Sequence, residues 1–170
     1  MILVGFSAAL RNSSTAALLL SDVEFTDQGA VLKIRRSKTD QLGKGREIGL
    51  VFGKHAETCP VAALKNWIAR RGAFPGVLFT RFDGHPPRDR ALAPERIGQI
   101  VQESVARIGL DSRAFGGHSL RAGFCTEAGL SGAPELLIAA TTGHKDMSTL
   151  RKYFRRRDAF AGNVCGLMDL

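Results

Sequence analysis

Two short segments of this 170-residue sequence carry side chains that could act together on a phosphate group. In the first, His118 and Arg121 follow directly after Gly116 and Gly117. At the start of a helix, this spacing places the imidazole and the guanidinium on one face, and the glycines permit close approach of a ligand. Because a helix N-terminus beside a cation suits an anion, the segment is a candidate phosphate site. The alternative is a capping or packed histidine near a solvated surface arginine.

The second segment surrounds Tyr153, which is the only tyrosine of the chain. A turn formed by Gly143 and His144 lies nine residues before it. Arginine or lysine occupies five of the six other positions from 151 to 157. A buried aromatic side chain rarely has cations on both sides within one helical turn. These charges would favour the phenolate form of the tyrosine.

A third group of charges lies between two predicted strands. The segment from 35 to 46 is too polar to form part of a core, and we expect it to project as a hairpin with a basic tip. Its five cationic residues are Arg35, Arg36, Lys38, Lys44 and Arg46.

The elements that position these residues are predicted to form one mainly helical α+β domain with a small three-stranded antiparallel sheet. Alternating apolar and polar residues between 23 and 52, with a turn at 27–29, are typical of antiparallel strands. Helical spacing and Gly or Pro punctuation predict helices over 1–20, 60–71, 94–108, 118–128, 134–140 and 148–160, with one short strand at 77–79.

The composition narrows the class of partner and of compartment. A net charge of +8 and a pI near 10.0 favour an anionic partner, and nucleic acid is the first candidate. An RNA-binding sheet would need aromatic residues on one face, and the predicted strand segment 31–36 contains none. The three scattered cysteines argue against a disulfide framework and a zinc site and fit a reducing, cytoplasmic setting. No apolar run approaches the ~18 residues of a membrane span.

Four segments, taken together, resemble the catalytic domain of the tyrosine recombinases, the phage integrase family. They occur in the family's order and cover nearly the whole chain: residues 5–11 ending in Arg11, Ser37-Lys38-Thr39, His118-Ser119-Leu120-Arg121, and Gly143-His144 followed by Tyr153. The resemblance implies an integrase-type helical domain with a small sheet. It also implies a site-specific recombinase that acts on double-stranded DNA with neither a metal nor a nucleotide cofactor.

The same resemblance implies how the phosphodiester would be broken. Tyr153 would attack the scissile phosphate and become covalently joined to the DNA 3′ phosphate. Arg11 and Arg121 would hold the non-bridging oxygens. Two planar guanidinium groups can neutralise the charge that builds on those oxygens in the transition state without a metal ion.

Further roles follow from the matching positions. His118 would act as acid or base near the nucleophile, and His144 would hydrogen-bond the phosphate. Lys38 would protonate the departing 5′ oxygen, and Lys44 on the same hairpin is the alternative for that role. The residues expected to contact DNA more generally are Arg35, Arg36, Lys44, Arg46, Lys145 and Arg151.

The chain departs from the family pattern in two places. The third residue after Arg11 is commonly acidic in the family, whereas this chain has Ser14. Family members normally carry an N-terminal core-binding domain that clamps DNA, and we expect residues 1–170 to be the catalytic domain without it. A catalytically impaired DNA-binding remnant or a truncated fragment is the alternative function. We expect a homotetramer on DNA, with a monomer as the alternative when the protein is free. The tail at 158–170 would pack either on its own core or on a neighbouring protomer.

Overall fold

A computed structural model describes residues 1–35, 45–81 and 91–154 of the chain. The first half contains α1 (Ile2–Ser7), α2 (Asn12–Ala17), β1 (Val23–Phe25), β2 (Gly29–Ile34), β3 (Arg46–Val51) and α3 (Pro60–Arg71). The second half contains α4 (Pro94–Ala106), α5 (Ser119–Leu130), α6 (Glu135–Thr142) and α7 (Met147–Arg151). Short 3-10 turns lie at Leu20–Asp22, Ala56–Thr58 and Ser112–Ala114. The predicted class, mainly helical with a small three-stranded antiparallel sheet, is confirmed.

The sheet has the order β1-β2-β3, and each neighbouring pair is antiparallel. In the central strand, Ala30, Leu32 and Ile34 are buried, whereas Lys33 between them is exposed. This alternation is the one expected of a strand with one face on the core. The buried face packs with α1 and α3 around Val4, Leu64 and Phe79 and forms the larger of two hydrophobic clusters.

The N-terminal segment does not form the single helix expected over 1–20. It forms α1 and α2, because the chain turns between them at Ala9, whose φ of 49° is left-handed. Arg11 thereby becomes the N-cap residue of α2. The strand expected at 77–79 is also wrong, because this segment pairs with residues 18–20 through an isolated bridge between Leu19 and Val77 rather than through a ladder.

The last predicted helix, 148–160, is shorter than expected within the described part of the chain. α7 ends at Arg151, and the N–H groups of Tyr153 and Phe154 donate to the carbonyls three residues earlier, as in a turn. The turn lets the Phe154 ring pack onto Gly129 of α5, where a Cβ would lie only 2.6 Å from the ring. Residues 155–160 lie outside the described residues.

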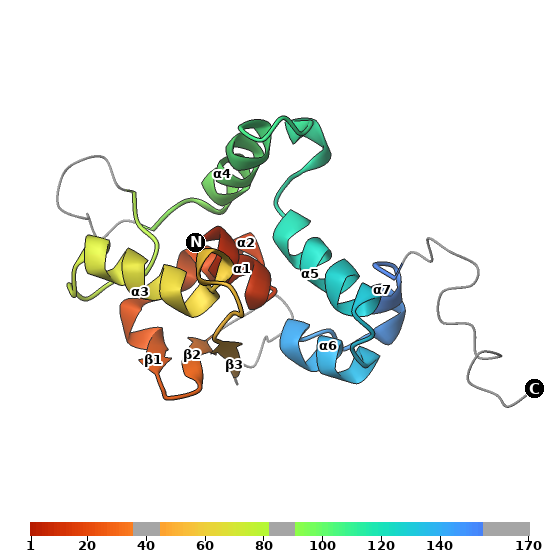
Figure 1. Ribbon diagram of the computed structural model, residues 1–170, viewed down its shortest axis with the longest axis horizontal. Helices are drawn as coiled ribbons and strands as arrows, with labels where there is room; N and C mark the ends of the chain where they lie inside the picture. The colour runs from red at the N-terminus through yellow and green to blue at the C-terminus, as the bar shows by residue number, and fades with distance from the viewer. Residues whose placement is uncertain (36–44, 82–90, 155–170) are drawn as a thin grey trace, which may run out of the picture.

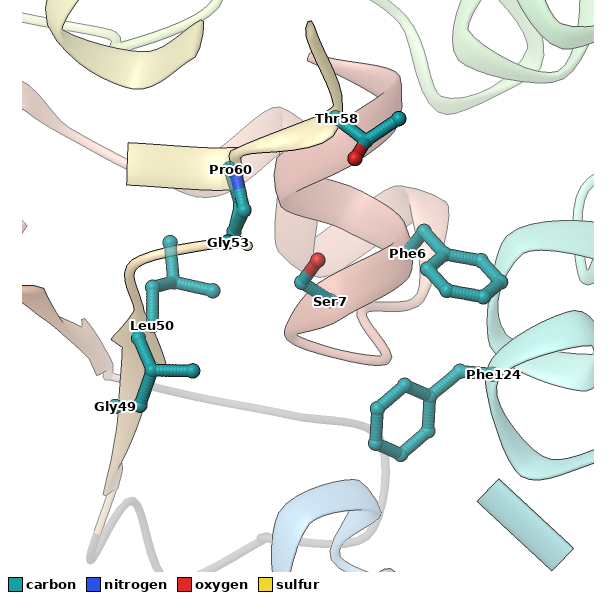
Figure 2. Close-up of a pocket in the computed structure, with 9 residues that line it drawn as sticks. Phe6, Ser7, Gly49, Leu50, Gly53, Thr58, Pro60 and Phe124 are labelled. Atoms are coloured by element: carbon teal, nitrogen blue, oxygen red, sulfur yellow. The ribbon is translucent and has the colours of Figure 1, made fainter. Parts of the chain in front are cut away.

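α5 lies between α1 on one side and α6 and α7 on the other (Figure 1). The helices α5 to α7 share a small hydrophobic cluster of Cys125, Ile138, Ala139 and Leu150. Where α5 meets α1, the rings of Phe6 and Phe124 make an edge-to-face contact with centroids 6.1 Å apart (Figure 2).

Beside these two rings lies a cleft of about 330 Å³ between α1, β3 and α5. Its lining is mostly apolar, and its side-chain polar groups are the hydroxyls of Ser7 and Thr58 (Figure 2). Among the described residues, its lining contains no titratable side chain, so the candidate site lies elsewhere. In the described ranges no cluster of metal-binding side chains occurs, and no helix there is both long and apolar enough to cross a membrane.

Candidate active site

The side chain of Arg121 is buried where three segments of the chain meet. It extends from the first turn of α5 and is 3% exposed. Its Nη1 donates to the carbonyl of Ala9 at 2.9 Å and to that of Thr142 at 2.6 Å, and its Nη2 lies 3.1 Å from Nε2 of His144. The alternative of a solvated surface arginine is therefore wrong. The guanidinium instead joins the α1–α2 turn to the C-terminal end of α6.

His144 lies in the turn after α6, between Arg121 and Tyr153. The turn depends on Gly143, whose φ of 70° and ψ of 35° are left-handed and favour glycine. Nδ1 of His144 lies 2.7 Å from the hydroxyl oxygen of Thr142. The His144 and Tyr153 rings have centroids 6.0 Å apart and an interplanar angle of 44°. The sequence-predicted histidine and tyrosine are thus brought together.

The charges around this site shift the acidity of its groups. Burial, followed by the nearby charges of Arg11 and Arg46, lowers the pKa of Arg121 to about 10. Burial and the charges of Arg121, Arg11 and Arg46 lower the pKa of His144 to about 4. At neutral pH the guanidinium is therefore charged and the imidazole is neutral.

Arg46, at the start of β3, belongs to the site. Its Nη1 donates to the carbonyls of Thr141 and Ala140 at the end of α6, and the guanidinium lies against Gly143. Burial and the charge of Arg11 lower the pKa of Arg46. The sequence predicts Arg46 only as a general DNA contact, and no local pattern indicates that it packs beside His144.

Arg11, Arg46 and Arg121 form what we call the arginine cluster. Within the described ranges, no carboxylate makes an ion pair with any of the three. The position where the family commonly has an acid is the buried Ser14, which brings no charge. Three neighbouring cations without a counter-charge are costly unless an anion joins them, so the cluster is a candidate anion site.

Two further predicted residues, His118 and Tyr153, differ in how far they are buried. His118 is the N-cap residue of α5, one turn before Arg121, and its exposed side chain makes no capping hydrogen bond. Tyr153 is half-buried, and its carbonyl accepts from the Thr126 hydroxyl at 3.4 Å. The structure therefore gathers Arg11, Arg121, His144 and Tyr153, and leaves His118 at the solvent-facing rim.

The sequence profile of the phage integrase family matches residues 1–159. This chain belongs to the phage integrase family. An integrase/recombinase xerD homolog of Selenomonas ruminantium is 34% identical to it over 171 residues, which cover 99% of this chain and 50% of the relative. The chain therefore spans about half the length of the curated relative that it matches.

Solved recombinase structures share the fold of this integrase-family chain. The XerH site-specific recombinase bound to a palindromic difH substrate, in a post-cleavage complex, has a TM-score of 0.70 at 21% identity, covering 89% of this chain and 40% of that one. The XerA recombinase has a TM-score of 0.69 at 19% identity, covering 92% of this chain and 50% of that one. At these identities, the likeness concerns the fold.

The other residues of the integrase-family chain that were predicted to contact DNA differ in whether they form ion pairs within the protein. Nε of Arg35 donates to Asp22 at 2.6 Å, so this arginine is held at the end of the central strand β2. Nε of Arg151 pairs with Glu135 at 2.9 Å, and Lys145 is exposed. Three predicted residues lie outside the described residues: Arg36, Lys38 and Lys44.

Proposed function

We propose that this integrase-family chain cleaves and rejoins DNA, with Tyr153 as the nucleophile. The phenolic oxygen would form a bond to the scissile phosphorus while the bond from phosphorus to the 5′ oxygen breaks, leaving a 3′-phosphotyrosine. The reverse attack by a 5′ hydroxyl would reseal the strand. Because one phosphodiester is exchanged for another, the reaction needs no nucleotide cofactor.

The arginine cluster is the observation that carries this proposal. Charge develops on the non-bridging oxygens of the phosphate during in-line displacement, and fixed cations stabilise it. Arg121 is fixed by its two carbonyl acceptors, and Arg11 and Arg46 lie close enough to lower pKa values around it. A phosphate held between Arg11 and Arg121 would supply the missing counter-charge and would lie near Tyr153.

Proton transfer would use residues at the edge of the cluster. His118, which is exposed one helical turn from Arg121, would accept the phenolic proton. Lys38 would protonate the departing 5′ oxygen, with Lys44 as the alternative. The strands β2 and β3 flank the segment that carries these lysines, and Arg46 at the start of β3 contacts the end of α6 beside His144. This contact places the start of β3, which follows that segment in the chain, beside the site.

The assembly is proposed from the family to which the chain belongs. Residues 1–170 would be the catalytic domain of a recombinase that acts on double-stranded DNA in the cytoplasm as a tetramer. The DNA clamp would be a separate N-terminal domain. Because the chain spans about half of its relative, a DNA-binding fragment with impaired catalysis is the second candidate function.

A covalent trap tests the proposal. A pool of nicked duplexes, randomised around the nick, is incubated with the chain, and protein-bound DNA is recovered under denaturing conditions and sequenced. The nick lets the short 5′-hydroxyl strand diffuse away, so the phosphotyrosine accumulates. The expected result is an adduct with wild type and none with Tyr153→Phe, which lacks the attacking oxygen and retains the ring.

Each other result has a definite meaning. An adduct that forms with Tyr153→Phe would overturn the choice of nucleophile. If wild type forms no adduct but binds duplex DNA with an affinity that falls as salt is raised, the impaired DNA-binding fragment is supported instead. Loss of both adduct and binding would remove DNA as the substrate of the isolated chain.

A further inference from the structure

The turn that carries His144 is held by one buried residue, Thr142. This residue is 0% exposed and is the last of α6. Its hydroxyl oxygen lies 2.7 Å from the carbonyl oxygen of Ile138, one helical turn earlier, and 2.7 Å from Nδ1 of His144. Its own carbonyl accepts from Nη1 of Arg121 at 2.6 Å. Thr142 therefore contacts both His144 and Arg121.

The direction of each hydrogen bond follows from the chemistry of the groups. A guanidinium has donors and no acceptor, so Nε2 of His144 must accept from Nη2 of Arg121. The proton of the neutral ring is then on Nδ1, which donates to the Thr142 hydroxyl oxygen. The hydroxyl proton in turn goes to the Ile138 carbonyl. Of the two neutral tautomers, only this one gives each of these donors an acceptor.

We propose that Thr142 is a positioning residue, whose hydroxyl accepts from Nδ1–H of His144 and thereby holds the ring with its Nε2 lone pair toward Arg121, the donor that excludes the Nε2–H tautomer. The expected effect of Thr142 on the rate of DNA cleavage rests on the proposed function, but the tautomer of His144 does not. In the Nε2–H tautomer, two donors would face each other across 3.1 Å, and the Thr142 hydroxyl could bond to Nδ1 only by giving up its hydrogen bond to the Ile138 carbonyl.

The surroundings of the ring reinforce this choice. The charged and titratable groups that face His144 are Arg121 from α5, Arg11 at the start of α2, Arg46 on β3, and Asp146 and Tyr153 on its own segment. Three of these are cations, and with burial they disfavour the doubly protonated ring. The neutral form is therefore the one whose tautomer must be set.

The turn itself is also braced from the opposite side. A Cβ at Gly143 would lie 3.2 Å from the Arg46 guanidinium, so the turn and that side chain are in close contact. The backbone of the turn is therefore held in place, and the orientation of the His144 ring depends on the hydrogen bond to Thr142.

Imidazole ¹⁵N shifts measured by NMR at neutral pH test the tautomer directly. The chain has four histidines, so His144→Gln identifies the resonances of His144. Wild type is expected to show a protonated Nδ1 and an unprotonated Nε2. Thr142→Val removes the hydroxyl at nearly constant shape and leaves Nδ1–H without its acceptor, so it is expected to weaken that pattern, whereas Thr142→Ser is expected to retain it.

Thr141→Val is the matched control. The Thr141 hydroxyl also donates to a carbonyl one turn earlier, that of Leu137 at 3.0 Å, but it does not contact His144. This variant should keep the wild-type ¹⁵N pattern. An unchanged pattern in Thr142→Val would overturn the proposal, as would an Nε2–H tautomer in wild type. If Thr142→Val fails to fold, Thr142→Ala against Thr142→Ser makes the same comparison.

The covalent trap adds a functional readout. Thr142→Val should bind duplex DNA as wild type does but form the adduct about tenfold more slowly, and Thr142→Ser should recover most of the rate. Equal rates in wild type and Thr142→Val would overturn the functional consequence. Should wild type form no adduct at all, the proposed function fails, and the ¹⁵N pattern still decides the role of Thr142.

Discussion

Two arginines of this chain are equally buried, at 3% exposure each, but they serve different regions of the molecule. Arg71 ends α3 and donates to the carbonyls of Gly72, Phe74 and Val77, all within six residues. Arg121 donates to carbonyls that lie 112 and 21 residues away. The first arginine closes a local loop, whereas the second joins the two halves of the chain.

The comparison shows that burial and hydrogen bonding do not by themselves mark a functional arginine. Both guanidinium groups are well satisfied by main-chain oxygens. The difference lies in the neighbours, because Arg121 shares its surroundings with Arg11, Arg46 and a histidine whose pKa is lowered to about 4. Uncompensated positive charge, and not burial, distinguishes the candidate active site.

Replacing each arginine with methionine should separate the two roles most clearly. Both Arg71→Met and Arg121→Met leave buried carbonyls without donors, so each should lower the free energy of unfolding by about 1–3 kcal/mol. Arg121→Met should also slow adduct formation by about 100-fold or more, because it removes a cation from the phosphate site. Urea unfolding and the covalent trap measure the two effects.

The two variants should also differ in where they loosen the molecule. Hydrogen exchange should accelerate around residues 72–78 in Arg71→Met and in α6 and α7 in Arg121→Met. Equal losses of adduct formation in the two variants would mean that Arg121 acts only through stability, and the distinction between the regions would fail.

A smaller effect should appear in the pH dependence of stability. The pKa of His144 in the folded chain, about 4, lies below its ordinary value of 6.5, so between these values the unfolded chain binds the extra proton. Stability from the neutral ring is therefore fully present above pH 6.5 and is lost as the pH falls toward 4.

Urea unfolding at pH 7 and pH 5 measures this loss. His144→Gln should lose less stability than wild type over this interval. His118→Gln is the matched control, because that side chain is exposed, and it should behave as wild type does. An unchanged difference between the two pH values in His144→Gln would show that burial and the arginine cluster do not lower the pKa of this ring.

The smallest effect is expected in the region of Arg35, where a DNA contact was predicted and the structure shows an ion pair. Asp22 is buried and accepts both from Arg35 and from the backbone N–H of Leu19 at 3.0 Å. Arg35→Gln should therefore cost about 1 kcal/mol or less of unfolding free energy, because the arginine itself is largely exposed.

A double-mutant cycle with Asp22→Asn separates the two roles of Arg35. If the pair is structural, the double variant should cost less than the sum of the single variants. If Arg35→Gln instead leaves stability unchanged and weakens the salt dependence of DNA binding, the predicted DNA contact is the correct role.

Much of the fold could be predicted from local sequence patterns. The helix from Pro60 to Arg71 has a proline in its first turn and Gly72 at its end, and both signals match the structure. The alternation in β2 also matches its burial. By contrast, Ala9 adopts a left-handed conformation without glycine or asparagine, so nothing in the sequence indicated that the helix expected over 1–20 would break there.

The candidate site was predictable only in part, for a similar reason. The spacing of His118 and Arg121, and the turn before Tyr153, are local patterns that the sequence displays directly. The place of Arg46 depends on a contact with Thr141, 95 residues away, and such contacts leave no local signal. The turn at Tyr153 depends on packing of Phe154 against α5, and tertiary packing there overrides the helical spacing.

The acceptors that fix the arginine cluster are main-chain oxygens, those of Ala9 and Thr142 for Arg121 and those of Ala140 and Thr141 for Arg46. Every amino acid supplies the same carbonyl. Side-chain substitutions at positions 140 and 141 can therefore accumulate without loss of these partners, provided that the backbone keeps its path. The site tolerates mutation along much of its supporting chain and is most sensitive at the left-handed positions, 9 and 143, that set the path itself.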